Sequence, residues 1–264
     1  AACLCFFLSS MTLVTTTPHL GALWVGIEGT TLSSAPLIYF HRHQRSLEAT
    51  WKYLIICSVG IALAMVGNIL LSVAFYTPEG MAAMVEGMDQ LGWFVSHARA
   101  GEETWLKAAY IFLLVGYGTK MGLAPLHNWL PSAHPVAPAP AHALLSGIIA
   151  KVGAIAAIRV IYFTVGAEAL RGTWVQTVCI VLTLVTIFMG SFMGCTENGL
   201  KKRLAYSSIS QISYVLLGVF LMTPVGLLGG LLQLLFHALA KIGVFQSAGS
   251  IIFLTGTEDR KSVV

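Results

Sequence analysis

Long apolar stretches separated by short polar segments run along the whole chain. Eight of them approach the length of about 20 residues that an α-helix needs to cross a bilayer. They cover residues 1–16, 19–40, 47–76, 104–124, 141–163, 173–193, 203–223 and 226–254. No stretch alternates with the period of a strand, and open sheets cannot lie in lipid. The pattern therefore predicts an all-α, polytopic membrane bundle of about eight transmembrane helices.

The composition agrees with this class. Of the 264 residues, 56% are hydrophobic and 10% are charged, whereas a soluble domain has about 25% charged residues. The net charge of +4 therefore says little about nucleic acid, which we do not expect as a partner. The five cysteines lack the spacing of metal ligands, and no haem, flavin or iron–sulfur pattern is present, so we expect no cofactor and no metal. The chain starts without Met inside an apolar run and ends abruptly, which favours a fragment.

The distribution of the 15 Lys and Arg residues predicts the orientation. If the loop after the second helix is cytoplasmic, eight of them lie on that side. These eight are Arg42, Arg45, Lys52, Lys201, Lys202, Arg203, Arg260 and Lys261. The loops at 41–46, 125–140, 194–203 and 255–264 are then cytoplasmic, in the inner membrane of a prokaryote. The long 78–103 loop is acidic and lies on the other side.

Residues 125–140, PLHNWLPSAHPVAPAP, differ from the rest of the chain. They contain five prolines and no Lys, Arg, Asp or Glu. Such a density of proline is incompatible with a regular helix. Transporters place broken helices at their ion sites, where the backbone is buried in protein or lines a wet cavity. We expect a broken helix of this kind here, and an ordinary cytoplasmic turn is the alternative.

Four charged residues interrupt the apolar stretches: Glu28, Lys120, Lys151 and Lys241. A charge at the bilayer centre costs about 2.5–3.5 kcal/mol on insertion scales, so such residues point to movement of charge. Glu28 lies among glycines and hydroxyls that can solvate a carboxylate. We predict that Lys120 loads and releases a proton as its distance from Glu28 changes. The alternatives are a neutral buried carboxyl and an inert ion pair that fixes helix register.

Histidines supply further candidates for proton transfer. His237 lies one helical turn before Lys241 on the same face, and imidazole exchanges protons at ambient pH. We predict that the two form a relay that follows Lys151, although a lone helical histidine is more often a core residue. Three histidines around the proline-rich stretch are candidates for proton uptake toward Lys151, with helix caps or hydrogen-bond donors as the alternative. These are His127, His134 and His142.

Several motifs resemble one family of membrane proteins. TKMGLAPLHNWLPSAHPVAPAPAHALLSG, ENGLKKRLAYSSISQISY and FHALAKIGVFQSAGSI resemble the proton-conducting, antiporter-like subunits of respiratory complex I, Mrp cation/proton antiporters and group 4 nickel–iron hydrogenases. GIEGTTLSSAPLIYFHRHQRSLEATWKYL looks most like the hydrogenase-4 component F branch. Together these motifs cover most of the chain.

The resemblance implies roles for the buried charges. Glu28 and Lys120 match the family's carboxylate–lysine pair, Lys151 its connecting lysine, and His237 with Lys241 the continuing relay. It also implies inverted five-helix repeats, with the first at 1–163 and part of the second at 164–264. Two positions depart from the pattern. Ser132 stands where the family usually has an acidic residue, and Lys151 where component F more often has a neutral polar residue.

These observations together predict a proton-translocating, non-catalytic membrane subunit of a redox-driven complex. The resemblance implies a complex of group 4 hydrogenase or NADH dehydrogenase type. The expected partners are other membrane subunits and, through them, a peripheral redox arm. One alternative is a subunit of an Mrp-type cation/proton antiporter. Another is a structural membrane arm that does not conduct.

Overall fold

The structure is a computed structural model that describes residues 2–74 and 103–256. These two ranges contain helices and no β-strand, which confirms the predicted all-α class. The elements are α1 (Ala2–Thr16), α2 (Leu20–Ile38), the 3₁₀ turn η1 (Tyr39–His41), α3 (Gln44–Ala74), α6 (Glu103–Met121), α7 (Trp129–Val136), α8 (Ala139–Leu144), the π-helical η2 (Leu145–Ile149), α9 (Ala150–Ile158), the π-helical η3 (Arg159–Val165), α10 (Ala167–Leu170), α11 (Trp174–Thr196), α12 (Leu200–Phe220) and α13 (Pro224–Thr255).

Each of the eight predicted apolar ranges contains helix, with ends that differ from the prediction by about three residues or fewer. In the described part of the chain, four helical segments are long and apolar enough to cross a membrane: 44–74, 139–165, 174–196 and 224–255. The count of eight spans therefore stays a prediction. Most of the acidic 78–103 loop and of the 255–264 loop lies outside the described residues.

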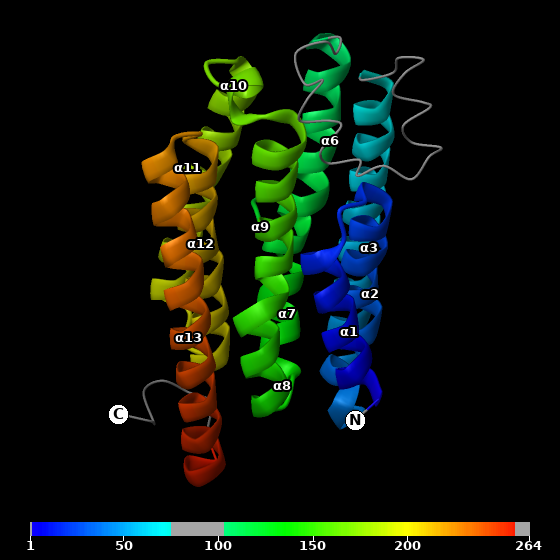
Figure 1. Cartoon of the computed structure of the whole chain (residues 1–264). Coiled ribbons are helices and arrows are strands. Elements are labelled where there is room, and N and C mark those ends of the chain that lie inside the picture. The colour runs from blue at the N-terminus through cyan, green and yellow to red at the C-terminus, as the bar shows by residue number, and fades with distance from the viewer. Residues whose placement is uncertain (1, 75–102, 257–264) are drawn as a thin grey trace.

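The helices lie side by side along one common direction (Figure 1). Helices α1, α2 and α3 form one side of the bundle, α6 to α9 the middle, and α11, α12 and α13 the other side. Helix α7 packs against both α3 and α12, and thus joins the two sides. Arg159 ties α1 to the middle, since its guanidinium donates to the carbonyl oxygens of Val14 (2.6 Å) and Thr17.

Helices α3 and α6 approach each other closely because their facing residues are small. A Cβ atom at Gly116 would lie 2.5 Å from the Cβ of Ala64 and 2.7 Å from the carbonyl oxygen of Gly60. Only a residue without a side chain fits there, as is usual where membrane helices cross closely. This contact positions the end of α6, and with it Lys120, against the middle of α3.

The proline-rich stretch at 125–140 is the expected broken helix rather than an open loop, since it contains α7 and the start of α8 on either side of a break. Helix α6 ends at Met121, where Gly122 takes the left-handed conformation (φ 78°), as glycine does after many helices. Pro131 lies in the first turn of α7, where a missing N–H leaves no helical hydrogen bond unmade. The chain breaks again at Ala137, in extended conformation, before α8 starts.

Helix α7 is buried, which excludes the alternative of an ordinary surface turn. Its buried side chains include Trp129, Leu130 and His134. The helix that follows, 139–165, contains two π-helical segments, one of which ends two residues before Lys151. Segments of this kind are frequent at functional sites. The break and the π-helical turn together give the middle of the bundle an irregular backbone that is buried in protein.

Candidate functional site

Lys120 lies in the last turn of α6 and is completely buried. Its Nζ donates hydrogen bonds to Thr31 Oγ1 of α2 (2.7 Å) and to the Tyr53 hydroxyl of α3 (3.1 Å). The ammonium lies 5.2 Å from the centroid of the Tyr53 ring. The Tyr53 hydroxyl also shares a hydrogen bond of 2.7 Å with Ser34 Oγ. Neutral hydroxyl groups, rather than a carboxylate, therefore surround this lysine.

Glu28 lies three residues before Thr31 on α2 and accepts a hydrogen bond from Ser58 Oγ of α3 (2.6 Å). Its Oε2 atom is buried and has no hydrogen-bond partner. Within the described residues, no ion pair of 4.0 Å or less joins Glu28 to Lys120. The two charges remain within electrostatic range of each other. They are separate members of one polar group, which is built by α2, α3 and α6.

A second polar group surrounds Lys151, which is also buried. Its Nζ donates to the carbonyl oxygen of Ser146 in η2. Ser146 Oγ in turn shares a hydrogen bond of 3.2 Å with Ser208 Oγ of α12. The π-helical turn therefore supplies the acceptor for this lysine, and α12 supplies the next hydroxyl.

Lys241 and His237 continue this group on α13. The Nζ of Lys241 donates to the carbonyl oxygen of Leu204 and to Ser207 Oγ, both at 3.1 Å. His237 is 5% exposed, and both of its ring nitrogens are buried without a hydrogen-bond partner. The imidazole lies within electrostatic range of both Lys151 and Lys241. The structure thus brings the three predicted relay residues together.

Two of the three histidines proposed for uptake form a pair of tilted rings, which contacts Phe245 beside Lys241. The ring centroids of His134 and His142 are 4.6 Å apart, and the Phe245 ring lies 3.8 Å from His142. His134 Nδ1 and His142 Nε2 are buried without a hydrogen-bond partner. His127 lies in the turn before α7 and does not belong to this pair. Only His134 and His142 therefore reach the second polar group.

An apolar cluster connects the two polar groups. It contains Tyr53, which contacts Lys120, and it extends through Trp129 of α7 and Ile149 of η2 to residues of α12. The Trp129 ring lies 5.1 Å from the Tyr53 ring, and its Nε1 donates to the carbonyl oxygen of Thr119 (2.8 Å). No continuous chain of hydrogen bonds therefore links the two groups through these residues.

Five residues that bind the charges are not among the sequence candidates. They are Thr31, Tyr53, Ser58, Ser146 and Ser207. In the sequence, these residues can be recognised only as polar side chains inside otherwise apolar stretches. The charged candidates have the same feature. In the described ranges no cluster of three or more His, Cys, Asp or Glu side chains is placed to hold a metal ion.

Comparison with known proteins places this site in a family. The sequence model described as "NADH:quinone oxidoreductase/Mrp antiporter, TM" matches residues 17–261. The chain belongs to this family. The match covers both polar groups, and it confirms the resemblance inferred from the motifs.

Two curated relatives of this family member illustrate its range. A hydrogenase-4 component F homolog of Methylacidiphilum infernorum is 33% identical over 254 residues, which are 95% of this chain and 52% of that protein. The NADH-quinone oxidoreductase subunit N of Desulforudis audaxviator is 34% identical over 244 residues, or 89% and 44% of the two chains. The chain therefore spans about half the length of the curated relatives it matches.

Solved structures share the fold of this family member. A chain of the membrane-bound sulfane sulfur reductase, an archaeal respiratory membrane complex, superposes with a TM-score of 0.85 at 22% identity, over 97% of this chain and 50% of that one. A chain of the Mrp complex from Dietzia sp. DQ12-45-1b gives 0.79 at 23% identity, over 95% and 44%. The fold is that of the antiporter-like membrane subunits.

Proposed function

We propose that this chain is part of a proton-translocating membrane subunit of a redox-driven complex. The names of its relatives, hydrogenase-4 component F homolog and NADH-quinone oxidoreductase subunit N, support a complex of group 4 hydrogenase or NADH dehydrogenase type. The chain's partners are then other membrane subunits and, through them, a peripheral redox arm. Its place is the inner membrane of a prokaryote, with the basic loops in the cytoplasm.

The surroundings of Lys120 carry this proposal. The completely buried ammonium of Lys120 donates hydrogen bonds to two neutral hydroxyls. The carboxylate of Glu28 lies nearby and accepts its hydrogen bond from Ser58 instead. A buried charge without an ion-pair partner is unfavourable, so the proton on Lys120 is held more firmly when Glu28 comes closer. A lysine whose proton depends on the position of a second group can load and release that proton.

The second polar group receives the proton in this scheme. The proton passes from Lys120 to Lys151, then to His237 and Lys241. The pair His134 and His142, which lies close to the second polar group, supplies uptake toward Lys151. The apolar cluster around Trp129 separates the first step from the rest. Transfer across it requires water molecules or a movement of α7, and redox chemistry in the partner subunits drives that change.

The domain division follows from the same proposal. Residues 1–163 form the first inverted repeat, with the first polar group and Lys151, and residues 164–264 supply part of a second repeat. Transporters commonly build their ion sites between such repeats, from helices that are broken at membrane depth. The broken segment with α7 and α8 fits this role.

Replacing Lys120 in the intact complex tests the proposal. We expect Lys120→Met to abolish proton translocation in proteoliposomes while electron transfer continues. Lys52→Met is the matched control, since Lys52 is an exposed lysine of α3 paired with Glu48, and it retains full translocation. Wild-type translocation in the Lys120→Met complex would refute the proposal.

A cation/proton antiporter subunit is the second candidate function. The description of the matching family favours it, because it names the Mrp antiporter beside NADH:quinone oxidoreductase, and a chain of the Dietzia Mrp complex shares the fold. An imposed Na⁺ gradient distinguishes the two candidates in proteoliposomes without an electron donor. Proton movement under that gradient supports the antiporter, and movement only with electron transfer supports the redox-driven subunit. Flanking genes for hydrogenase or dehydrogenase subunits also support the redox-driven subunit.

A further inference from the structure

Arg159 is a charged residue that neither polar group contains. It lies in η3 and is half-buried, and its guanidinium donates to the carbonyl oxygens of Val14 (2.6 Å) and Thr17 at the C-terminal end of α1. The last carbonyl groups of a helix lack helical partners and carry partial negative charge. A guanidinium is a planar fork of donors that can bind two such acceptors together. The end of α1 therefore stabilises the charge on Arg159.

Helix α1 in turn packs closely against the part of α2 that carries Glu28. A Cβ atom at Gly26 would lie 2.8 Å from Val14 Cγ2, and one at Gly29 would lie 2.7 Å from Ser10 Oγ. Small residues allow helices in a membrane to approach in this way. Because Glu28 lies between the two glycines in the sequence, a displacement of the end of α1 acts directly on the segment that carries this carboxylate.

Two hydrogen bonds connect the same segment of α2 to α3. The Trp24 Nε1 atom donates to the carbonyl oxygen of Ile61 (2.7 Å), and Ser58 Oγ donates to Glu28 (2.6 Å). Trp24 lies one helical turn before Glu28, so the two bonds lie on neighbouring turns. Hydrogen bonds weaken steeply when their geometry is disturbed. The place of the Glu28 carboxylate therefore depends on α3 on one side and on α1 on another.

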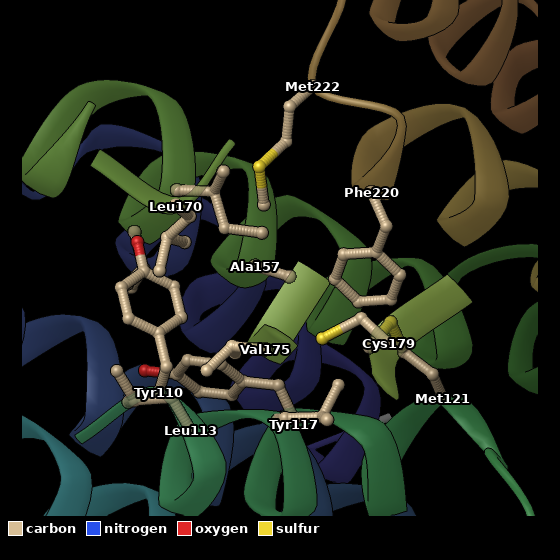
Figure 2. A pocket seen from close by; sticks show the side chains of 13 residues that line it. Tyr110, Leu113, Tyr117, Met121, Ala157, Leu170, Val175, Cys179, Phe220 and Met222 are labelled. Carbon is tan, nitrogen blue, oxygen red and sulfur yellow. The ribbon is translucent and has the colours of Figure 1, made fainter. Parts of the chain in front are cut away.

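Arg159 belongs to the same helical segment, 139–165, as Lys151, which lies eight residues earlier. Tyr162 connects this segment to α12, because its hydroxyl donates to a carbonyl oxygen of that helix (2.8 Å). Toward α6 and α11 the segment instead lines an apolar pocket, in which Ala157 is one of the lining residues (Figure 2). Apolar contacts are not directional. Arg159 and Tyr162 therefore supply directional contacts that fix the C-terminal part of this segment, the first on α1 and the second on α12.

We propose that Arg159 is a positioning residue for Glu28, which acts by holding the end of α1 against the helical segment that carries Lys151. Loss of its two hydrogen bonds releases the end of α1, and the close packing of α1 on α2 carries the movement to Glu28. The carboxylate then leaves its bond with Ser58, and its distance from Lys120 changes. Through the same contacts, a movement of the segment with Lys151 reaches Glu28. The effect on transport rests on the proposed function, whereas the structural link does not.

The experiment compares variants of the intact complex by proton translocation and by high-resolution structure. Arg159→Gln removes the charge and the fork of donors, and Arg159→Lys keeps the charge without the fork. Gly26→Ala disturbs the same link at another point, because its Cβ would lie 2.8 Å from the Val14 side chain while Arg159 is unchanged. Arg171→Gln is the matched control, since Arg171 is an exposed arginine that directly follows α10.

We expect Arg159→Gln and Gly26→Ala to lower the protons translocated per electron at least two-fold while electron transfer continues, and Arg171→Gln to leave that ratio unchanged. Arg159→Lys should lie between Arg159→Gln and wild type, because an ammonium binds two carbonyl groups less well than a guanidinium. The maps of Arg159→Gln and Gly26→Ala should show Glu28 away from Ser58. A purely structural role of Arg159 would instead lower the yield of complex and leave Glu28 in place.

Two results overturn the inference. One is wild-type translocation in Arg159→Gln, and the other is a map of this variant in which Glu28 keeps its bond with Ser58. If Arg159→Gln does not assemble, the same two measurements on Gly26→Ala decide the matter. Loss of translocation in Lys120→Met with normal translocation in Arg159→Gln refutes the positioning role alone. Normal translocation in Lys120→Met refutes the proposed function, and the maps then decide on the structural link by themselves.

Discussion

The ammonium of Lys120 donates a hydrogen bond of 2.7 Å to Thr31, a residue 89 positions earlier in the chain. Glu28 lies three residues before Thr31 on α2, and residues at this spacing share a face of the helix. The lysine therefore holds a neutral acceptor while a charged acceptor lies about one turn away.

The Tyr53 hydroxyl is the second acceptor for Lys120, and its removal should weaken the site. Tyr53→Phe leaves the buried ammonium with one hydrogen bond fewer, and an unsatisfied buried partner costs about 1–3 kcal/mol. We expect a lower melting temperature of the complex and several-fold lower proton translocation. Tyr214→Phe is the control, because the Tyr214 side chain is exposed and does not contact Lys120. Equal behaviour of Tyr53→Phe and wild type in both measurements contradicts the prediction.

His237 offers a test that separates stability from transport. Its ring nitrogens are buried without partners, so an apolar side chain of similar size removes an unsatisfied group. We expect His237→Leu to leave the melting temperature unchanged or higher and to reduce proton translocation at least five-fold. His41→Gln, on an exposed position, serves as the control. A marked loss of stability with normal translocation would show that His237 only supports the packing.

The helices and the positions of the buried charges can be predicted from the sequence, because both depend on hydropathy alone. Lys120, Lys151 and Lys241 interrupt apolar stretches, and the structure buries all three. A charged side chain in such a stretch almost always faces the interior of the bundle, because exposure to lipid is unfavourable.

The partners of those charges cannot be predicted in the same way. Lys120 binds Thr31 and Tyr53 rather than Glu28 because the rotation of α2 and α3 about their axes decides which side chain reaches it. The bounds of α7 within the predicted broken helix cannot be predicted either, for another reason. Proline density argues against helix, but Pro131 falls in a first turn where proline is tolerated, and tertiary burial of Trp129 stabilises the rest.

The close contact of α3 and α6 predicts a strong effect at Gly116. An added Cβ would lie 2.7 Å from the backbone nitrogen of Ala64, which cannot move without the whole helix. We expect Gly116→Ala to destabilise the protein by about 1–3 kcal/mol, as overpacking does, and to lower the yield of assembled complex. Gly229→Ala is the matched control, because no atom of the described residues lies within 4 Å of its added Cβ. Equal melting temperatures of the two variants would contradict this account of the contact.

The ion pair between Glu197 and Lys202 predicts a dependence of stability on pH. Lys202 Nζ lies 2.7 Å from Glu197 Oε2, and its hydrogen bond and charge hold the pKa of the Glu197 carboxyl below the usual value of 4.5, against the opposing effect of partial burial. A carboxyl with a lowered pKa in the folded state adds stability above its unfolded pKa, and this stability is lost as the pH falls through the folded value.

We therefore expect Glu197→Gln to destabilise the protein at neutral pH by about 0.2–1 kcal/mol, the range of exposed pairs, and to match wild type once the pH has fallen below the lowered pKa of the folded state. Thermal unfolding at both pH values measures the difference. A double-mutant cycle with Lys202→Gln assigns it to the pair, and high salt should reduce it because the pair is partly exposed. A difference that persists unchanged in acid would mean that Glu197 acts through packing or backbone hydrogen bonds, since the charge on its carboxylate is then already neutralised.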